Sequence, residues 1–417
     1  MKENEHKLTA KQYLTPFILI TTLFFLWGFS RAILDVLNKH FQNILDISIT
    51  QSAYIQVMTY LGYFIMALPA GLFIQRFSYR KGVILGLVLF GVGSLLFIPT
   101  AYIGQFYAYL IPLFIIGCGL VFLETAANPY VTELGSSKTA TSRLNLSQSF
   151  NGLGSLFATL VVGQFLFSNT DNDGNIVIPY SILGVLVLCI ALVFTRVDLP
   201  EIQPAALYKE NESMHPYAQL FQHKMFVFGL IALLAYEVAE ISINSYFINF
   251  VTAQGWMSDN VASVVLTIAL ALFMVGRFVG SWLMRFIPPR KMLLYCSVAS
   301  IICMLLILIN AGRVSVVALV CNYLFEAIMF PTIFALSLNS LGALTKYGSS
   351  ILMMMPIGGC TFLLMGYVAD TCNVVIPFLI PLVGFVLVML YALLLCVRKR
   401  IEGELTSRKV EGTNIKC

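Results

Sequence analysis

The feature that most constrains this sequence is a succession of about twelve apolar stretches joined mostly by short polar turns. A helix needs about 20 apolar residues to cross the hydrocarbon core of a bilayer. Only helices and closed barrels satisfy their backbone groups in lipid, and the sequence lacks the short alternating segments of a barrel. We therefore expect an all-α polytopic membrane protein of about 12 transmembrane helices. The expected spans are residues 14–38, 50–75, 82–103, 106–134, 142–168, 176–195, 224–252, 260–284, 291–310, 314–340, 347–369 and 374–397.

Composition supports the same class and excludes several others. Apolar residues make up 59% of the 417 residues and charged residues 11%, with a mean hydropathy of +0.87, far from the balance of a soluble domain. The nine cysteines lack paired spacing and the four histidines lie in termini or loops, so we expect neither disulfides nor a metal site. No phosphate-binding loop and no recognisable nucleophile with its base are present, so we expect no cofactor and no enzyme.

The distribution of basic residues predicts the orientation. Most of the 25 lysines and arginines fall on the side that holds both termini, whereas the opposite loops carry only Lys39 and Arg313. The positive-inside rule then places both termini in the cytoplasm. The N-terminal segment has no cleavable signal peptide pattern. We expect a multi-pass protein of the bacterial inner membrane whose net charge of +5 reflects topology, with no nucleic-acid partner.

The chain divides near its middle. Its longest polar connection, residues 196–223, contains three prolines that interrupt helical continuation. We expect six-helix halves at 1–195 and 224–397, with 196–223 as a cytoplasmic linker and 398–417 as a cytoplasmic tail.

An internal duplication supports two pseudo-symmetric halves. Gly71 and Arg76 of the first half recur in the second half as Gly280 and Arg285, both at the same sequence separation. Likewise, Glu124 and Pro129 recur as Glu326 and Pro331. Such repeats typify carriers that bind substrate near the bilayer midplane between the halves and rock to expose it to either side.

Charged residues inside the spans are the strongest functional signal, because each costs several kcal/mol at the bilayer centre unless paired or hydrated. They are Arg31, Asp35, Glu124, Glu237, Glu240, Arg277 and Glu326. Carboxyl groups suit proton coupling, because burial raises a carboxyl pKa toward physiological pH. We predict Asp35 and Glu124 as the residues that couple protonation to substrate binding, with Glu240 and Glu326 as secondary candidates.

Structural explanations remain open for several of these charges. Arg31 and Asp35 are spaced i, i+4 and could neutralise each other on one helical face. Glu237 and Arg277 have no partner that the sequence reveals, and we interpret them as structural.

Amides suit the recognition of sugar hydroxyls. Asn145, Gln148 and Asn151 recur every third residue on one face of the fifth span, and we predict Gln148 and Asn151 as substrate contacts, although helix-to-helix hydrogen bonds are an alternative. Trp27 is a secondary candidate for stacking on a sugar. Further candidates for the polar lining are Asn38, Asn128, Asn244 and Asn322.

Several motifs extend through both halves, among them FFLWGFSRAILDVLNKHFQ, FLETAANPYVTELG, RLNLSQSFNGLG and GRFVGSWLMRF. Through them the chain resembles the L-fucose/proton symporter family of the major facilitator superfamily, which also includes glucose, galactose and acetylglucosamine importers. The resemblance implies proton-coupled sugar symport. It assigns the proton and sugar carboxylates to Asp35 and Glu124, and the sugar-binding amides to Gln148 and Asn151.

Three departures from the family leave the sugar open. Ala32 replaces an asparagine and Arg31 stands beside it, the segment around Glu240 is closer to the glucose/galactose branch, and Gln75 replaces the usual aspartate. We expect a monomer in the lipid bilayer that imports L-fucose with a proton. A glucose, galactose or amino-sugar importer, a sugar receptor and a proton-coupled efflux carrier are the alternatives, and sodium coupling is open. The amides of the fifth span argue against efflux.

Overall fold

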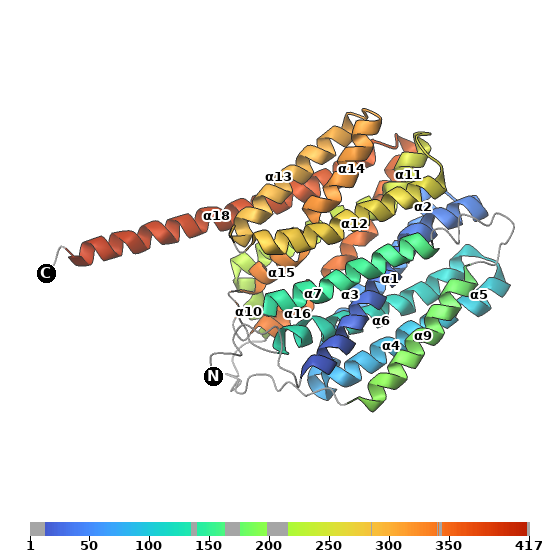
Figure 1. Cartoon of the computed structure of the whole chain (residues 1–417), viewed down its shortest axis with the longest axis horizontal. Helices are drawn as coiled ribbons and strands as arrows, with labels where there is room; N and C mark the ends of the chain where they lie inside the picture. The colour runs from blue at the N-terminus through green and yellow to red at the C-terminus, as the bar shows by residue number, and fades with distance from the viewer. Residues whose placement is uncertain are drawn as a thin grey trace.

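The computed structural model describes residues 13–134, 140–162, 176–197, 216–284, 286–339, 341 and 344–414. This part of the chain is helical, without strands, and its long helices pack side by side in one bundle (Figure 1). The helices are α1 Leu14–Leu45, α2 Ile49–Ser52, α3 Tyr54–Phe77, α4 Tyr79–Leu95, α5 Phe97–Ile103, α6 Leu110–Glu133, α7 Ala140–Phe157, α9 Val177–Arg196, α10 Pro216–Gln222, α11 Lys224–Ala253, α12 Asp259–Leu283, α13 Pro289–Leu308, α14 Arg313–Glu326, α15 Met329–Leu338, α16 Thr345–Leu352, α17 Phe362–Thr371 and α18 Leu379–Asn414.

Within the described residues, 11 helical segments are long and apolar enough to cross a membrane. The expected fifth span is not among them. It consists of α7 followed by a π-helical turn at Ala158–Val162, and the polar run through Gln148 and Asn151 makes it less apolar. Its predicted end at 163–168 lies outside the described residues. The prediction of an all-α membrane protein with about twelve spans is confirmed.

Two apolar cores fill the bundle. One is built from α1 to α9 and the other from α10 to α18, except that Ile241 belongs to the first and Ala53 to the second. Figure 1 shows the first set, in blue and green, beside the second, in yellow to red. The boundaries of the predicted linker stay a prediction, since residues 198–215 lie outside the described part.

Two helices extend beyond the predicted spans. We expected the first span to end at residue 38, but α1 continues to Leu45, because the segment after Asn38 contains no proline or glycine to stop it. The last span, expected at 374–397, agrees with the candidate membrane segment Ile376–Arg398, and α18 itself continues beyond it to Asn414 as a projecting helix (Figure 1). The segment after Val397 has several lysines, arginines and glutamates, which favour helix, and again no proline.

The bundle has two ends, which we name by the chain. The terminal end is where α1 begins and α18 leaves the bundle, and the opposite one is the far end (Figure 1). At the far end Asp370 of α17 accepts hydrogen bonds from the Thr50 backbone N–H (2.9 Å) and hydroxyl (2.6 Å). Asn43 of α1 donates to Asp259 at the start of α12 (2.7 Å). Both contacts join the two halves.

The halves also meet toward the terminal end. Gly71 of α3 lies against Ser350 of α16, so closely that a β-carbon at this glycine would be 2.6 Å from the serine hydroxyl. Asn128 of α6 contacts the sulfur of Met353 at 3.8 Å. The halves are therefore in contact on both sides of the bundle centre. Arg285, which corresponds to Arg76 in the internal duplication, lies outside the described residues.

We predict that Asp370→Ala loosens the far end, because it removes the acceptor of both Thr50 hydrogen bonds. The rate of amide exchange in the peptide that contains α2 should rise about threefold to fivefold, as expected if the two exposed hydrogen bonds together contribute roughly 1 kcal/mol. Hydrogen exchange with mass spectrometry measures this. A peptide from α13 is the internal control, and equal uptake of the α2 peptide in both proteins would contradict the prediction.

Candidate functional site

A polar site lies between the halves at the bundle centre. It consists of two small adjoining chambers of about 20 and 40 Å³. The first, the Glu124 chamber, is lined by Trp27, Arg31, Glu124, Gln148, Asn151, Tyr236, Glu237, Glu240, Arg277, Phe330 and Pro356. The second, the Asp35 chamber, is lined by Arg31, Ala32, Asp35, Tyr60, Asn151, Gly152, Ser155, Glu240, Ile241, Asn244, Leu270, Phe273 and Arg277. Four polar or charged residues line both chambers and so form the wall between them: Arg31, Asn151, Glu240 and Arg277.

Arg31 links the halves at this wall. Its Nη2 donates to Glu237 Oε2 at 3.0 Å and to Glu240 Oε2 at 2.8 Å, both on α11. Its Nε donates to the Tyr60 hydroxyl at 3.3 Å. No Arg31–Asp35 ion pair forms among the described residues, although the spacing on α1 allows one. The sequence showed no partner for Glu237, because the partner lies on a helix of the other half.

Asp35 faces a hydrogen-bonded network. Its Oδ1 accepts from the Ser245 hydroxyl at 2.8 Å, and Gln56 Nε2 donates to the same serine at 3.1 Å. Asn38 joins behind, donating to Gln56 at 3.4 Å and accepting from Gln42. The structure therefore places Asp35 on a chamber, but Asn38 in the network that supports it and not on the lining.

Glu124 lies one chamber away from Asp35. Its Oε1 accepts from the Tyr63 hydroxyl at 3.4 Å, and the residue is almost fully buried. Trp27 lines the same chamber, and its indole N–H has no partner within the described residues. A buried N–H donor without an acceptor is rare, so this tryptophan offers a donor to a ligand.

The Gln148 amide of α7 is held by residues of α6 and α12. Gln148 Nε2 donates to Asn128 at 3.3 Å, while Arg277 Nη1 donates to the side-chain and backbone oxygens of Gln148 at 3.1 and 3.0 Å. Asn151 lines both chambers. Asn128 thus orients Gln148 and does not itself line a chamber. The side chain of Asn145 lies outside the described part.

Arg277, which we interpreted as structural, is part of the site as well. Pro331 has no N–H to bond the carbonyl four residues earlier, that of Ala327, and α14 and α15 separate at this point. Arg277 Nε donates to the Ala327 carbonyl at 3.2 Å, and its guanidinium lies 4.5 Å from the Phe273 ring centre. The signal in the sequence was the intramembrane proline, which indicates a free carbonyl but not its donor.

The remaining candidates separate into two groups. Asn244 lines the Asp35 chamber and donates to Glu240 at 3.2 Å, and its own Oδ1 has no partner among the described residues. Asn322 donates to Glu326 at 2.7 Å, and this fully buried pair lines neither chamber. Both side chains are enclosed within the second half in this structure, and their predicted part in the site stays a prediction.

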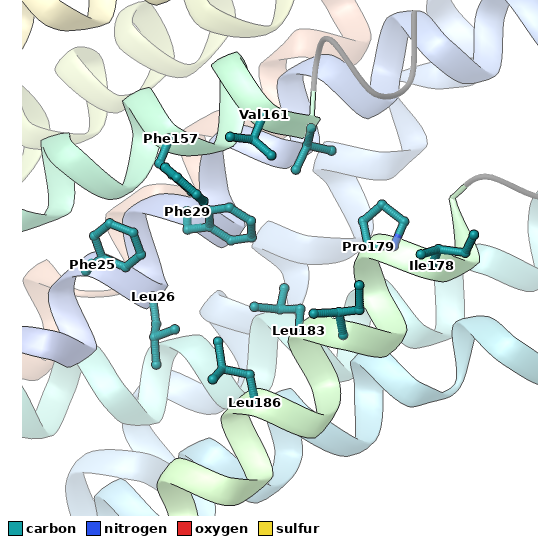
Figure 2. A pocket seen from close by; sticks show the side chains of 11 residues that line it. Phe25, Leu26, Phe29, Phe157, Val161, Ile178, Pro179, Leu183 and Leu186 are labelled. Atoms are coloured by element: carbon teal, nitrogen blue, oxygen red, sulfur yellow. The ribbon is translucent and has the colours of Figure 1, made fainter. Parts of the chain in front are cut away.

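A separate cavity opens at the side of the first half. Its volume is about 300 Å³, and Figure 2 shows the apolar side chains of α1, the end of α7 and α9 that surround it, including Phe29, Phe157 and Leu183. Its described lining offers no charge and no hydrogen-bonding side chain, in contrast to the two polar chambers.

A family model described as the Major Facilitator Superfamily matches residues 20–363. The chain belongs to the major facilitator superfamily. This facilitator is 33% identical to the L-fucose-proton symporter of Escherichia coli, over 92% of its own length and 93% of the relative. It is 35% identical to a glucose/galactose transporter of Brucella abortus, over 93% and 96% of the two chains. The resemblance seen in the motifs is confirmed.

Solved structures agree with this assignment. The crystal structure of the facilitator FucP in the outward conformation matches with a TM-score of 0.75 and 33% identity, covering 92% of this chain and 99% of that one. A D-xylose-proton symporter matches with a TM-score of 0.68 at 13% identity, which shows the fold alone. This chain is therefore a multi-pass membrane transporter of the facilitator type.

We predict that Arg277→Met destabilises this facilitator, because the Ala327 carbonyl and the Gln148 oxygens lose their charged donor in a buried site. The apparent melting temperature in detergent should fall by several degrees. The matched control is Arg313→Met, which removes an exposed arginine at the start of α14. A melting temperature no lower than that of this control would contradict the role of Arg277.

Proposed function

We propose that this facilitator imports a small neutral sugar together with protons across the bacterial inner membrane. The observation that carries the proposal is a set of unpartnered polar atoms on the chambers. Within the described residues, these are the Trp27 Nε1 donor and the acceptors Glu237 Oε1 and Asn244 Oδ1. A sugar hydroxyl both donates and accepts a hydrogen bond. It therefore suits a lining that offers one donor and two acceptors.

Charge balance supports proton coupling. The two chambers hold four acids and two arginines, so full ionisation would leave an excess of two negative charges in an enclosed, poorly hydrated space. Enclosing unpaired charge is costly. Glu237 and Glu240 have Arg31 as a partner, and Asp35 and Glu124 have no arginine within ion-pair distance among the described residues. We assign the coupling protons to Asp35 and Glu124, with the proton as coupling ion and no cofactor.

The relatives restrict the substrate class. They are named as L-fucose-proton symporters and glucose/galactose transporters, at nearly equal identity. L-fucose stays our first candidate, with glucose, galactose and amino sugars as the alternatives. Gln148, held by Arg277 and Asn128, and Asn151 on the shared wall are the amides that we assign to sugar hydroxyls.

We assign transport to rocking of the two halves around the chambers. Both termini are cytoplasmic in this proposal, as the basic residues indicate, so the far end faces the periplasm. The protein acts as a monomer, because each chain has its own site between its halves.

The test is uptake of labelled L-fucose, glucose, galactose and glucosamine into proteoliposomes that contain the purified chain. We expect accumulation of one sugar above its outside concentration when a proton gradient is imposed, and none after an uncoupler collapses the gradient. A parallel sodium gradient without a proton gradient separates the two coupling ions. Absence of accumulation of every sugar would contradict the proposed function.

We predict that Glu124→Gln abolishes accumulation and spares exchange. Glutamine keeps the hydrogen-bonding shape of a protonated glutamate but cannot release a proton, so the gradient no longer drives uptake. Accumulation should fall at least tenfold, while exchange of labelled against unlabelled sugar should change less than threefold. Gradient-driven uptake at the wild-type level would contradict the role of Glu124.

A further inference from the structure

We propose that Arg31 acts as an internal counter-ion, which lets the two halves close without sugar and is displaced from Glu237 and Glu240 when sugar binds. The inference rests on the proposed function. It concerns a residue that departs from the family motif in the first helix and whose role the motif therefore does not supply.

A single nitrogen atom of Arg31, Nη2, bridges the two halves. Glu237 and Glu240 are three residues apart on α11, so their carboxylates lie on one helical face. Arg31 Nη2 contacts both, at 3.0 and 2.8 Å, from α1 of the first half. A second ion pair between the halves, Lys39 with Asp259 at 3.9 Å, lies at the far end. The Arg31 bridge is thus the charged connection of the halves at the bundle centre.

Burial makes the bridge necessary for closure. The Glu237 side chain is 1% exposed and that of Glu240 is 11% exposed. Removing one partner of a buried ion pair is strongly destabilising, because it leaves a charge without compensation. If a neutral residue replaced Arg31, closing the halves would enclose two adjacent carboxylates without a counter-ion. Closure of the sugar-free carrier is therefore favoured by Arg31, or by protonation of the glutamates in its absence.

The size of the chambers shows why the bridge must part for a sugar. A cavity needs about 10–15 Å³ of space for the centre of a water-sized sphere to hold one water molecule. The chambers, at about 20 and 40 Å³, therefore hold only a few waters. Small-molecule sites are typically hundreds of Å³ in volume. Arg31 and Glu240 belong to the wall between the chambers, so withdrawal of Arg31 removes one of the four side chains that separate them. Sugar hydroxyls can then donate to the two glutamates in its place.

This role separates two modes of transport. Net uptake requires the sugar-free carrier to close and return, whereas exchange uses only the loaded carrier. An arginine that closes the sugar-free carrier should matter for the first mode and much less for the second. A mere sugar contact would affect both modes alike.

The experiment compares Arg31→Gln with the wild type in proteoliposomes, for the sugar that the uptake screen identifies. We expect proton-driven net uptake to fall at least tenfold and exchange to fall less than threefold. The matched control is Arg80→Gln, which removes an arginine that donates to the Phe194 and Thr195 carbonyls within the first half. This control should leave the ratio of net uptake to exchange unchanged. Equal loss of both modes in Arg31→Gln, or loss of neither, would overturn the proposal.

A second readout needs no sugar. Deuterium uptake of peptides from residues 27–38 and 236–246 should rise severalfold in sugar-free Arg31→Gln, because the closed arrangement is less populated. It should return toward the wild-type level in Arg31→Gln/Glu237→Gln/Glu240→Gln, in which both carboxylates of the bridge are replaced by neutral amides. Unchanged deuterium uptake in Arg31→Gln would overturn the inference. If Arg31→Gln does not fold, the triple variant is compared with Glu237→Gln/Glu240→Gln, and the inference predicts similar protection.

The two readouts distinguish the inference from the function on which it rests. If the deuterium uptake changes as expected but the wild type accumulates no sugar, the proposed function fails and the bridge still controls closure. If the wild type accumulates sugar but neither readout responds to Arg31→Gln, the function stands and the inference fails.

Discussion

The cost of placing charge inside a bilayer organises this molecule. Six charged side chains that the apolar spans carry line one pair of chambers, where they face each other and not lipid. Lipid exposure would cost several kcal/mol for each. Two bundles whose charges lie on facing surfaces satisfy this constraint only by meeting at those surfaces. Arg31 is central, because one guanidinium from the first half serves two carboxylates of the second.

Irregular backbone at the centre of the bundle depends on the same polar groups. Pro331 leaves the Ala327 carbonyl without its helical partner, and Arg277 supplies a donor from α12. Non-helical backbone at membrane depth is tolerated where protein groups satisfy it. Because Arg277 also holds Gln148 of α7, it connects three helices of both halves. The break between α14 and α15 and the amide that we assign to sugar binding therefore share one donor, Arg277.

Closure on both sides of the site relates structure to transport. The far end is joined by Asp370 with Thr50 and by Asp259 with Asn43, and α3 meets α16 toward the terminal end. The far-end hydrogen bonds are exposed, so they can be exchanged for water at little cost. The bridge at the centre is buried, and its separation needs a replacement partner. In the mechanism that we propose, this difference makes the centre the point at which sugar and protons control which end opens.

The sequence predicted most of the charged and amide residues that line the chambers, but not which of their side chains contact each other. Charged residues in apolar spans indicated Asp35, Glu124 and Glu240, and the three-residue spacing indicated Gln148 and Asn151, all of which lie on a chamber. Their roles stay proposals. The same reasoning placed Glu326 and Asn322 with them by symmetry, although this pair is enclosed in the second half. It also left Glu237 and Arg277 without a role, because each finds its partner on a distant helix.

The sequence alone determined that this protein is a membrane bundle of about twelve helices and which face of each helix is polar, because hydropathy and helical period are local properties of the chain. Only the tertiary structure decided which polar faces meet. Arg31 is one turn from Asp35 on its own helix yet pairs with Glu237 and Glu240. The physical reason is that the register between two helices is set by packing of whole surfaces, which no short stretch of residues specifies.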